Sequence, residues 1–441
     1  MFMIKSSKRV ALFMIRIRIR ISMMKKFILV LVLLPFIFCS ANAEDIVRIN
    51  MDEAVKIALA KNVTYQSKKR ELEIAEKNIK IANRLKNPQF FAHTLIGRVT
   101  RSNNSQLGMN IPVEVMKRGA RKKVAIAEYE KTKTELEKYE YNLKIDVKEA
   151  YFNILIAKSY YILMQRKERW YKAVLNVAEH KKNTEPRYEI NVLRAKTKHE
   201  RELMDLNYLQ SNVNSAICNF NKVLNTNERT ITYDTVEDSL SDNNKIMGLN
   251  IPSYEHLEEI ALKNNYELRV SKDDINIADR NVTLAKRQVI PDLQLAAGYA
   301  YQKMTVHDPY NGAYVTAGVD LPIFYTYRPE IQKAKITLDR LKCDKIAYED
   351  ILRYTIQDNY NKFYAHKKNM ESAKKIYDDM DRILILESRA YERNEIRLMD
   401  LMNIEDSQQQ YMTEFIESIN QYYKAYLDLL RNLGQDITEV L

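Results

Sequence analysis

The sequence predicts a mainly helical chain in which one large unit occurs twice, each copy combining a long αα-hairpin with a pair of β-strands. Two observations support this prediction. Residues 48–90 align with residues 251–293 at a constant offset of 203, without a gap, and the chain's eight glycines leave two long stretches empty. A period of about 200 residues is too long for a solenoid repeat, so we expect two copies of one structural unit.

The matched positions run through both copies. Under the offset of 203 the identical residues are Ala58-Leu59 and Ala261-Leu262, Asn62 and Asn265, Ile74-Ala75 and Ile277-Ala278, Asn78 and Asn281, Ala82 and Ala285, and Pro88 and Pro291. Further on, Ile111-Pro112 matches Leu321-Pro322, and from Val147, which matches Ile356, the offset is 209. We therefore predict repeats at 44–248 and 249–441.

The first 43 residues have the features of a signal peptide. Lys25-Lys26 precedes the apolar run Phe27–Phe38, and Ala41-Asn42-Ala43 supplies a small-x-small cleavage site. The run is too short for a membrane-spanning helix, which needs about 20 residues. We expect the true start at Met23 or Met24 and an exported chain. Lipidation at Cys39 is disfavoured, because bulky Phe38 precedes it.

The basic charge comes mostly from this leader. Eight of the 70 basic residues and none of the 58 acidic residues lie in residues 1–43, so the net charge of +12 falls to +4 without them. We therefore expect no nucleic-acid partner. The cysteines that remain, Cys218 and Cys343, are expected to be small buried hydrophobic residues without metal or redox spacing.

The glycine-free stretches, between Gly119 and Gly248 and between Gly318 and Gly434, are predicted to be helical hairpins at about 118–226 and 329–434. Apolar and aromatic side chains recur there at alternating spacings of four and three, which is typical of a coiled-coil seam. The seams are Leu143, Val147, Ala150, Ile154, Ala157, Tyr161 and Met164, and Phe363, His366, Met370, Ala373, Tyr377, Met380 and Leu384. Residues 121–182 as one helix would be ~93 Å long. Asn225 and Gly434 are candidate caps for the returning helices.

Strands are expected at about 88–99, 105–114, 291–303 and 313–323. Apolar residues alternate there with small or polar ones, as in membrane strands. The segment 90–99 is less regular, because Phe91 and Leu95 fall on the second face. The alternative is that the two strand pairs are two soluble hairpins.

Four strands cannot close a barrel, and an open edge is not tolerated in lipid. Two copies would give eight strands and a filled interior, whereas three would give twelve and a channel. The small residues on the second face, Gly108, Gly298, Ala300 and Gly318, favour an open lumen and therefore three copies.

The segment Ala54–Pro88, with Ala58-Leu59, Asn62, Ala75, Ala82 and Asn87-Pro88, resembles the opening signature of the TolC-like outer-membrane efflux proteins, and Ala261–Pro291 resembles its second occurrence. Ile111-Pro112-Val113-Glu114 with Arg118-Gly119-Ala120-Arg121 is similar to the CzcC-like heavy-metal branch.

The resemblance implies a homotrimer with a twelve-stranded transmembrane β-barrel in the outer membrane and an α-helical barrel across the periplasm. Its implied function is the outer-membrane channel of a tripartite efflux or type I secretion system. Its implied partners are a periplasmic adaptor and an inner-membrane pump, RND-type or ABC-type.

By resemblance, adaptor docking falls on the hairpin tips: Arg187, Tyr188, Glu189, Ile190, Arg393, Asn394, Glu395 and Ile396. The channel gate falls on Asp400 and Asn403, similar to the family's Asp-Val-Leu-Asp segment, and on Asn191 and Arg194 at the corresponding places of the first copy. Asn403 replaces the second acidic residue. An Asp400 ring in a trimer would attract cations.

We expect no enzymatic activity and no cofactor, because the sequence lacks a phosphate loop, a nucleophile elbow and a zinc motif. The six histidines lack metal spacing. The alternative function is a periplasmic coiled-coil adaptor or scaffold protein without a membrane barrel, for which the duplication and the strand pairs have no explanation.

Overall fold

The computed structural model describes residues 45–94, 103–182, 189–228, 230–240, 248–303, 310–393 and 395–437. The chain divides into two compact units, Met1–Val47 with Glu228–Thr232, and Arg48–Asn227 with Tyr233–Leu441. In the smaller unit, the Ile231 N–H donates to the Glu228 carbonyl at 3.3 Å. The larger unit holds the long helices and a four-stranded sheet.

The predicted strand pair and long hairpin occur in this order in both copies, and each strand pair is preceded by two helices. The first copy contains α2 (Met51–Lys61), α3 (Val63–Ala82), β2 (Gln89–Thr94), β3 (Asn103–Val113), α4 (Lys117–Lys182) and α5 (Glu189–Leu224). The second contains α6 (Tyr254–Asn264), α7 (Tyr266–Gln288), β5 (Leu293–Lys303), β6 (Tyr310–Val319), α8 (Arg328–Glu392) and α9 (Leu398–Leu433). Two short strands, β1 (Asp45–Ile49) and β4 (Ile231–Thr235), form a separate sheet.

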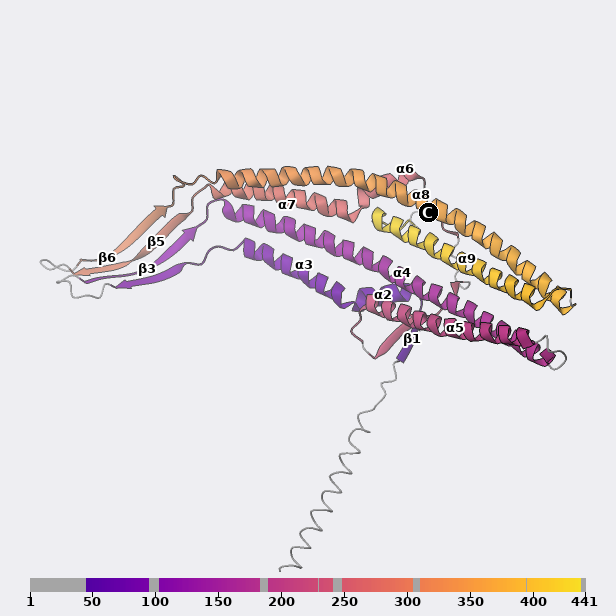
Figure 1. The fold of residues 1–441 in the computed structure, drawn as a ribbon. Helices are drawn as coiled ribbons and strands as arrows, with labels where there is room; N and C mark the ends of the chain where they lie inside the picture. The colour runs from indigo at the N-terminus through magenta and orange to yellow at the C-terminus, as the bar shows by residue number, and fades with distance from the viewer. Residues whose placement is uncertain are drawn as a thin grey trace, which may run out of the picture. The chain divides into compact units, whose positions relative to one another are not determined.

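The long hairpins confirm the predicted fold class. α4 has 66 residues and α8 has 65, so each is about 100 Å long at ~1.5 Å per residue. α4 packs against α5, and α8 packs against α9. Figure 1 shows the helices side by side in the order α3, α4, α7 and α8, with α4 and α7 in contact across the two repeats. Among the described residues, no helix is both long enough and apolar enough to cross a membrane.

In each repeat, one asparagine links the short helix pair to the end of the hairpin's second helix. The two asparagines, Asn62 and Asn265, occupy matching positions of the repeat. Asn62 ends α2 and caps α3 by accepting the Tyr65 N–H at 2.8 Å, while its amide donates to the carbonyls of Val223 and Leu224 at the end of α5. In the second copy, Asn265 accepts the Leu268 N–H at 2.9 Å. Its amide donates to the Asn432 carbonyl at 2.7 Å. Both asparagines are almost completely buried, so the repeat conserves them for backbone capping.

The predicted caps of the returning helices both adopt left-handed backbone conformations. Gly434 has φ 70° and donates its N–H to the Leu430 carbonyl. Asn225 has φ 46°. A side chain at Gly434 would also meet the Asn264 carbonyl carbon at 2.9 Å. Glycine therefore allows both the turn and the close approach of α6.

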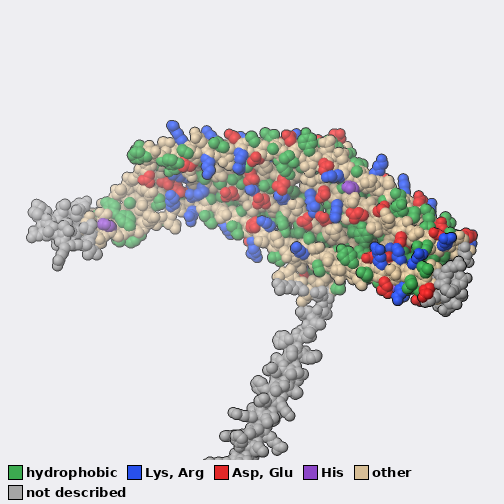
Figure 2. Space-filling model, in the orientation of Figure 1, with side chains coloured by type: hydrophobic (Ala, Val, Ile, Leu, Met, Phe, Trp, Pro, Cys, Tyr) green, Lys and Arg blue, Asp and Glu red, His purple; other side chains and the backbone are tan. Residues whose placement is uncertain are grey.

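The larger sheet is antiparallel in the order β2-β3-β5-β6. Its register places Phe90 opposite Met109, Leu107 opposite Tyr299 and Ala297 opposite Val315, so the predicted apolar sets share one face. That face is open in the single chain, with Phe90 69% and Val315 82% exposed. On the helices, Figure 2 shows hydrophobic, acidic and basic side chains interspersed on the visible face.

The side chain of Tyr314 lies beside both Gly108 and Gly298, with its Oη atom 2.7 Å and 2.6 Å from where their Cβ atoms would be, and the side chain of the irregular Phe91 lies beside Gly108. One residue-level prediction was wrong. Cys218 and Cys343 are free and exposed rather than buried, because each lies on a helix face that no other element of the described chain covers.

Candidate functional site at the hairpin ends

The ends of both hairpins lie at the end of the larger unit opposite its sheet (Figure 1). Here α4, α5 and α9 share a small buried core. Its members are Tyr171, Val174, Ala178, Ala195 and Met402. Tyr171 and Ala195 are completely buried. Because Met402 belongs to the second repeat and the others to the first, the core joins the two hairpins near their tips.

Asp406 on α9 connects the hairpins through polar contacts. Tyr171 Oη donates to Asp406 Oδ1 at 2.8 Å, and Lys198 Nζ lies 2.6 Å from Oδ2. Lys167 Nζ lies 3.3 Å from the same carboxylate and 3.0 Å from Glu202 Oε1 on α5. Burial alone would raise the pKa of Asp406, but hydrogen bonds from Lys198 and Tyr171 hold that pKa below its ordinary value. Asp406 is therefore an anion bound by both helices of the first hairpin.

The neighbouring carboxyl group of Glu405 is in the opposite situation. Glu405 is 8% exposed, and within the described residues its Oε2 atom has no hydrogen-bond partner. Burial raises its pKa to about 7, with Lys167 opposing the shift and the nearby carboxylates of Asp406, Asp381 and Glu202 adding to it. A buried carboxyl group that titrates near neutral pH therefore lies next to one that stays charged.

The predicted gate residue Asp400 lies in the first turn of α9 and is exposed. Its Oδ2 atom accepts the N–H of Arg397, the N-cap residue of α9, at 3.3 Å. Asn403 is exposed one turn later, and its carbonyl accepts the Ser407 hydroxyl at 2.9 Å. On α5, Arg194 is exposed and Asn191 is partly buried. Asp400 therefore has a structural role whether or not it lines a gate.

The predicted docking tips are partly described. Glu189 and Ile190 are exposed at the start of α5, Arg393 pairs with Glu395 at 3.4 Å, and Ile396 is partly buried. Arg187, Tyr188 and Asn394 lie outside the described residues.

A groove of about 490 Å³ contains one predicted docking residue, Ile190, and one predicted gate residue, Arg194. It is lined by Ile190, Leu193, Arg194, Thr197, Lys198 and Arg201 from α5 and by Met399 and Met402 from α9. Ile190 and Leu193 are each nearly 60% exposed. The groove is lined by apolar and basic side chains, a suitable surface for an amphipathic segment that carries acidic residues.

Comparisons by sequence are negative, since no family model and no curated protein matches the chain. Comparison of folds is decisive. The structure is similar to CusC, described for its folding and transmembrane channel formation, with TM-score 0.71, 13% identity, and 88% of this chain and 93% of that chain covered. A membrane protein from Pseudomonas aeruginosa gives TM-score 0.73, 14% identity, and 89% and 91% coverage. The open-state outer-membrane channel MtrE of Neisseria gonorrhoeae gives TM-score 0.66, 16% identity, and 87% and 89% coverage.

The chain has a TolC-like fold. The similarity extends over nearly the whole length of this chain and of each of the three structures, and this confirms the predicted resemblance.

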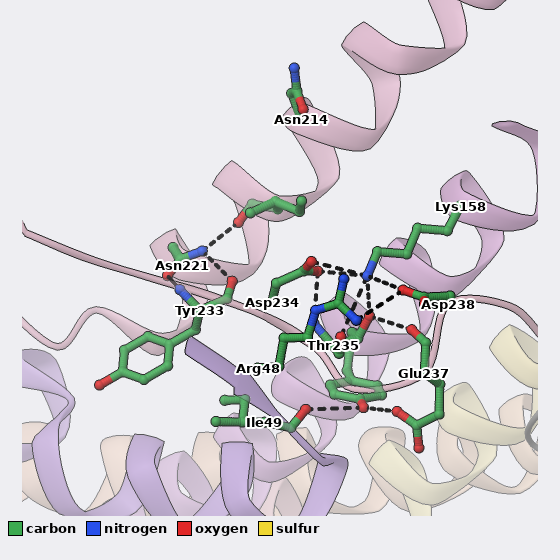
Figure 3. Close-up of polar contacts among 12 residues, drawn as sticks. Arg48, Ile49, Lys158, Asn214, Asn221, Tyr233, Asp234, Thr235, Glu237 and Asp238 are labelled. Carbon is green, nitrogen blue, oxygen red and sulfur yellow. Dashed lines mark hydrogen bonds and ion pairs between the residues drawn. The ribbon is translucent and has the colours of Figure 1, made fainter. Parts of the chain in front are cut away.

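A second polar cluster in the TolC-like chain is structural (Figure 3). Lys158 on α4 is 9% exposed, lies 2.9 Å from Asp234 Oδ1 and donates to Thr235 Oγ1 at 2.8 Å. Nearby, Asn221 holds Tyr233 through a pair of 2.9 Å hydrogen bonds. These contacts attach residues 233–235 to α4 and α5. Because Asp234 and Thr235 satisfy the buried lysine, its burial does not indicate a ligand-binding site.

Sequence reasoning missed the Glu405–Asp406 site. The sequence contained one indication of it: Tyr171 lies seven residues after Met164 and so continues the apolar seam of the long helix. The contacts of Asp406 with Lys167 and Lys198 could not be predicted from such a pattern, because they join residues more than 200 positions apart. In the described residues, no group of three or more His, Cys, Asp or Glu side chains is placed to hold a metal ion.

Proposed function

We propose that this chain is the outer-membrane channel of a tripartite efflux or type I secretion system, a passive trimeric exit duct through the outer membrane and periplasm. One observation carries the proposal: a sheet with one exposed apolar face is attached to two ~100 Å hairpins in a TolC-like fold. An eleven-residue strand such as β5 spans about 36 Å, or about 25 Å when tilted by 45°, which equals the apolar band of a membrane barrel.

The edges of the sheet support the trimer. β2 and β6 are its outer strands, and the backbone groups on their outer sides need partners in lipid. Three copies supply twelve strands, enough for a closed barrel with a lumen. A coiled-coil adaptor or scaffold would leave the apolar face of the sheet in water, so we do not favour that alternative.

The groove between α5 and α9 supports docking of a periplasmic adaptor at the hairpin ends, with an RND-type or ABC-type pump beyond it. We keep Asp400, Asn403, Asn191 and Arg194 as the proposed gate. CusC is one of several similar structures with comparable scores, so the CzcC-like branch stays a prediction.

The test is to produce the full chain, with its leader, in a bacterium with two membranes. The duct predicts recovery in the outer-membrane fraction as a detergent-stable trimer, and discrete conductance steps in planar bilayers. A soluble periplasmic monomer without conductance would contradict the proposal.

A further inference from the structure

We propose that the chain carries a binding surface for anionic phospholipid head groups where its larger sheet joins the helices. This surface rests on the proposed duct, because the strands must lie in lipid for it to reach head groups. We call it the basic band. It comprises residues 76–88, 114–123, 282–292 and 320–334, which are the linkers at that edge of the sheet together with about two turns of each adjoining helix.

All four segments of the basic band lie at one edge of the sheet. The register pairs Leu293 with both Val113 and Val319, and Gln89 with Asn110, so two strands begin at this edge and two end there. Figure 1 shows the ends of the long helices at the same edge. The polar layer on each side of a bilayer is about 5–8 Å thick, and seven helical residues extend about 10 Å. In the duct, the band therefore lies at and just beyond the head groups of the leaflet that faces the periplasm.

Basic residues are concentrated in this band. It contains 13 Lys or Arg and five Asp or Glu, a net charge of +8, whereas residues 44–441 together carry only +4. The remainder of those residues therefore carries −4. Most of the excess belongs to the first repeat, whose two segments carry +7, while the two segments of the second repeat carry +1. Such a local excess favours a negatively charged partner over a solvated surface of mixed charge.

Two acids of the band are already bound by basic residues of the chain. Glu114 Oε1 lies 3.0 Å from Arg121 Nη1 and 3.5 Å from Lys86 Nζ. Asp292 Oδ1 lies 2.8 Å from Lys117 Nζ, and its Oδ2 lies 3.3 Å from Lys86 Nζ. These ion pairs hold the linkers that precede β2 and β5 against the start of α4. They account for three of the cations in the band.

Other cations of the first repeat have no acid beside them. Arg121 Nη2 donates to the Arg84 carbonyl at 3.3 Å, so the start of α4 lies against the segment that follows α3 and the basic residues of both come together. Within the described part of the chain, no ion pair forms at Arg84, Arg118, Lys122 or Lys123. The first turn of α4 also lacks acidic residues, although the start of a helix favours acidic over basic side chains. An anion from outside the chain would offset this repulsion.

Exposed apolar side chains in the same segments indicate that the anion belongs to a membrane. Leu85 and Met116 are 71% and 63% exposed beside the cations of the first repeat, and Phe324 of the second repeat is completely exposed. Cations next to exposed apolar and aromatic side chains are typical of a surface within the head-group layer. Clusters of Lys and Arg at this depth select anionic lipids. Phosphatidylglycerol presents a phosphate without the cationic group that phosphatidylcholine places beside its own.

Lipid retention tests the preference for charge. The full-length protein in detergent is mixed with phosphatidylglycerol or with phosphatidylcholine of the same acyl chains, washed on an affinity column, and the bound lipid is measured. At about 0.15 M salt we expect roughly five times more phosphatidylglycerol than phosphatidylcholine, and less than about twice as much at about 1 M salt, where charges are screened within about 3 Å. Equal retention of the two lipids by an intact trimer would overturn the proposal and leave an acidic partner protein as the alternative.

Substitutions locate this preference in the band. The test variant combines Arg84→Gln, Lys122→Gln and Lys123→Gln, which removes three cations and keeps the ion pairs within the band. The control variant removes three exposed cations of α8, about 70–80 Å along that helix from its start: Lys374→Gln, Lys375→Gln and Arg382→Gln. We expect the preference to fall below about twofold in the test variant and to persist in the control. The same preference in both variants would contradict the assignment to the band.

Competition with inorganic phosphate separates a lipid from a free anion. At constant ionic strength, added phosphate should leave the retained phosphatidylglycerol unchanged, because the acyl chains and the exposed apolar side chains also contribute to binding. Release of the lipid by phosphate would overturn the lipid assignment in favour of a site for free anions.

A tryptophan probe tests the contact within a membrane. Leu85→Trp combined with Trp170→Phe leaves one tryptophan in the chain. In phosphatidylcholine vesicles, brominated phosphatidylglycerol should quench its fluorescence roughly twice as strongly as the same fraction of brominated phosphatidylcholine. The control, Tyr208→Trp with Trp170→Phe, places the probe at an exposed position of α5 and should be quenched by neither lipid.

The outcomes separate this surface from the duct. Equal quenching of the Leu85→Trp variant by both lipids, or no quenching in a trimer that conducts, would reject the anionic-lipid surface and leave the duct unaffected. Loss of outer-membrane recovery and of conductance in the wild-type chain would instead reject the duct, and this surface with it.

Discussion

Lys198 on α5 lies 2.6 Å from Asp406 on α9, so an ion pair joins the two hairpins of one chain near their ends. The same carboxylate accepts the Tyr171 hydroxyl from α4. Three helices are therefore held by one side chain, and its environment has consequences for stability and for the proposed gate.

Asp406→Asn should weaken the polar contacts that join the two hairpins. It removes a partly buried anion and leaves Lys198 and Lys167 with a weaker acceptor, so we expect a loss of about 1–3 kcal/mol in the free energy of unfolding. Denaturant melts measure this loss, and conductance should rise in bilayers. The control is Asp428→Asn, because the ion pair of Asp428 with Arg431 stays within one helix. Equal losses of stability in the two variants would contradict a stabilising role for the contacts of Asp406 between the hairpins.

Glu405 should make stability depend on pH. Its pKa is raised to about 7, so the folded chain holds this proton more tightly than the unfolded chain. The stabilisation is complete below the ordinary value of 4.5 and is lost as the pH rises through about 7. At about 1.4 kcal/mol per pKa unit it amounts to roughly 3 kcal/mol.

Melting temperatures between pH 4.5 and 8 measure this effect. Glu405→Gln, a neutral mimic of the protonated acid, should flatten the profile across this window. Asp406 acts outside it, because its lowered pKa removes stability only as the pH falls below its ordinary value. Parallel profiles for wild type and Glu405→Gln would rule out this role.

Asn62→Ala should destabilise the chain by about 2–4 kcal/mol. The change removes a helix cap and leaves the Val223 and Leu224 carbonyls without their amide donor. Asn50→Ala is the matched control, because Asn50 caps α2 at an exposed position and should cost about 1 kcal/mol. Chemical denaturation distinguishes the two, and equal losses would show that burial of Asn62 adds nothing.

Gly298→Ala should destabilise the sheet by about 1–3 kcal/mol, because a Cβ atom there meets Gly108 Cα at 2.8 Å and the Tyr314 hydroxyl at 2.6 Å. Gly318→Ala is the control, since its Cβ would meet nothing nearer than Gln294 Cβ at 3.9 Å. Thermal dissociation of the proposed trimer, followed on gels, measures both. A tolerated Gly298→Ala would contradict the close contact, because both the Tyr314 side chain and the backbone of β3 would have to shift.

Asp400→Asn separates charge from capping at the proposed gate, because an asparagine oxygen can still accept the Arg397 N–H. We expect weaker divalent-cation block and altered single-channel conductance, with an unchanged melting temperature. Asp400→Ala should show the same changes together with a loss of about 1 kcal/mol from the missing cap. If neither variant alters conductance or block, the gate lies elsewhere.

Much of the fold could be read from local pattern. The seam through Val147 and Ile154 predicted one face of a helix, and both residues are fully buried. The alternation Leu107, Met109, Ile111 predicted a strand face, and the register places all three on it. Such patterns depend on residues a few positions apart, so sequence alone encodes them.

The candidate site was harder to predict from the sequence. Asp400 was selected by resemblance, and the structure gives it a capping role that a motif does not reveal. The burial of Glu405 depends on how α4, α5, α8 and α9 rotate against one another, which no single helix specifies.

By itself, the sequence determined the duplication, the long helices, the alternating strands and the paired asparagines Asn62 and Asn265, because each depends on periodicity or on capping within a few residues. Only the tertiary structure decided that Tyr314 covers Gly298, that Cys218 and Cys343 lie on open faces, and that Lys198 meets Asp406. These features depend on packing between segments far apart in the chain, where the relative rotation of two helices or the choice of one rotamer determines which side chains meet.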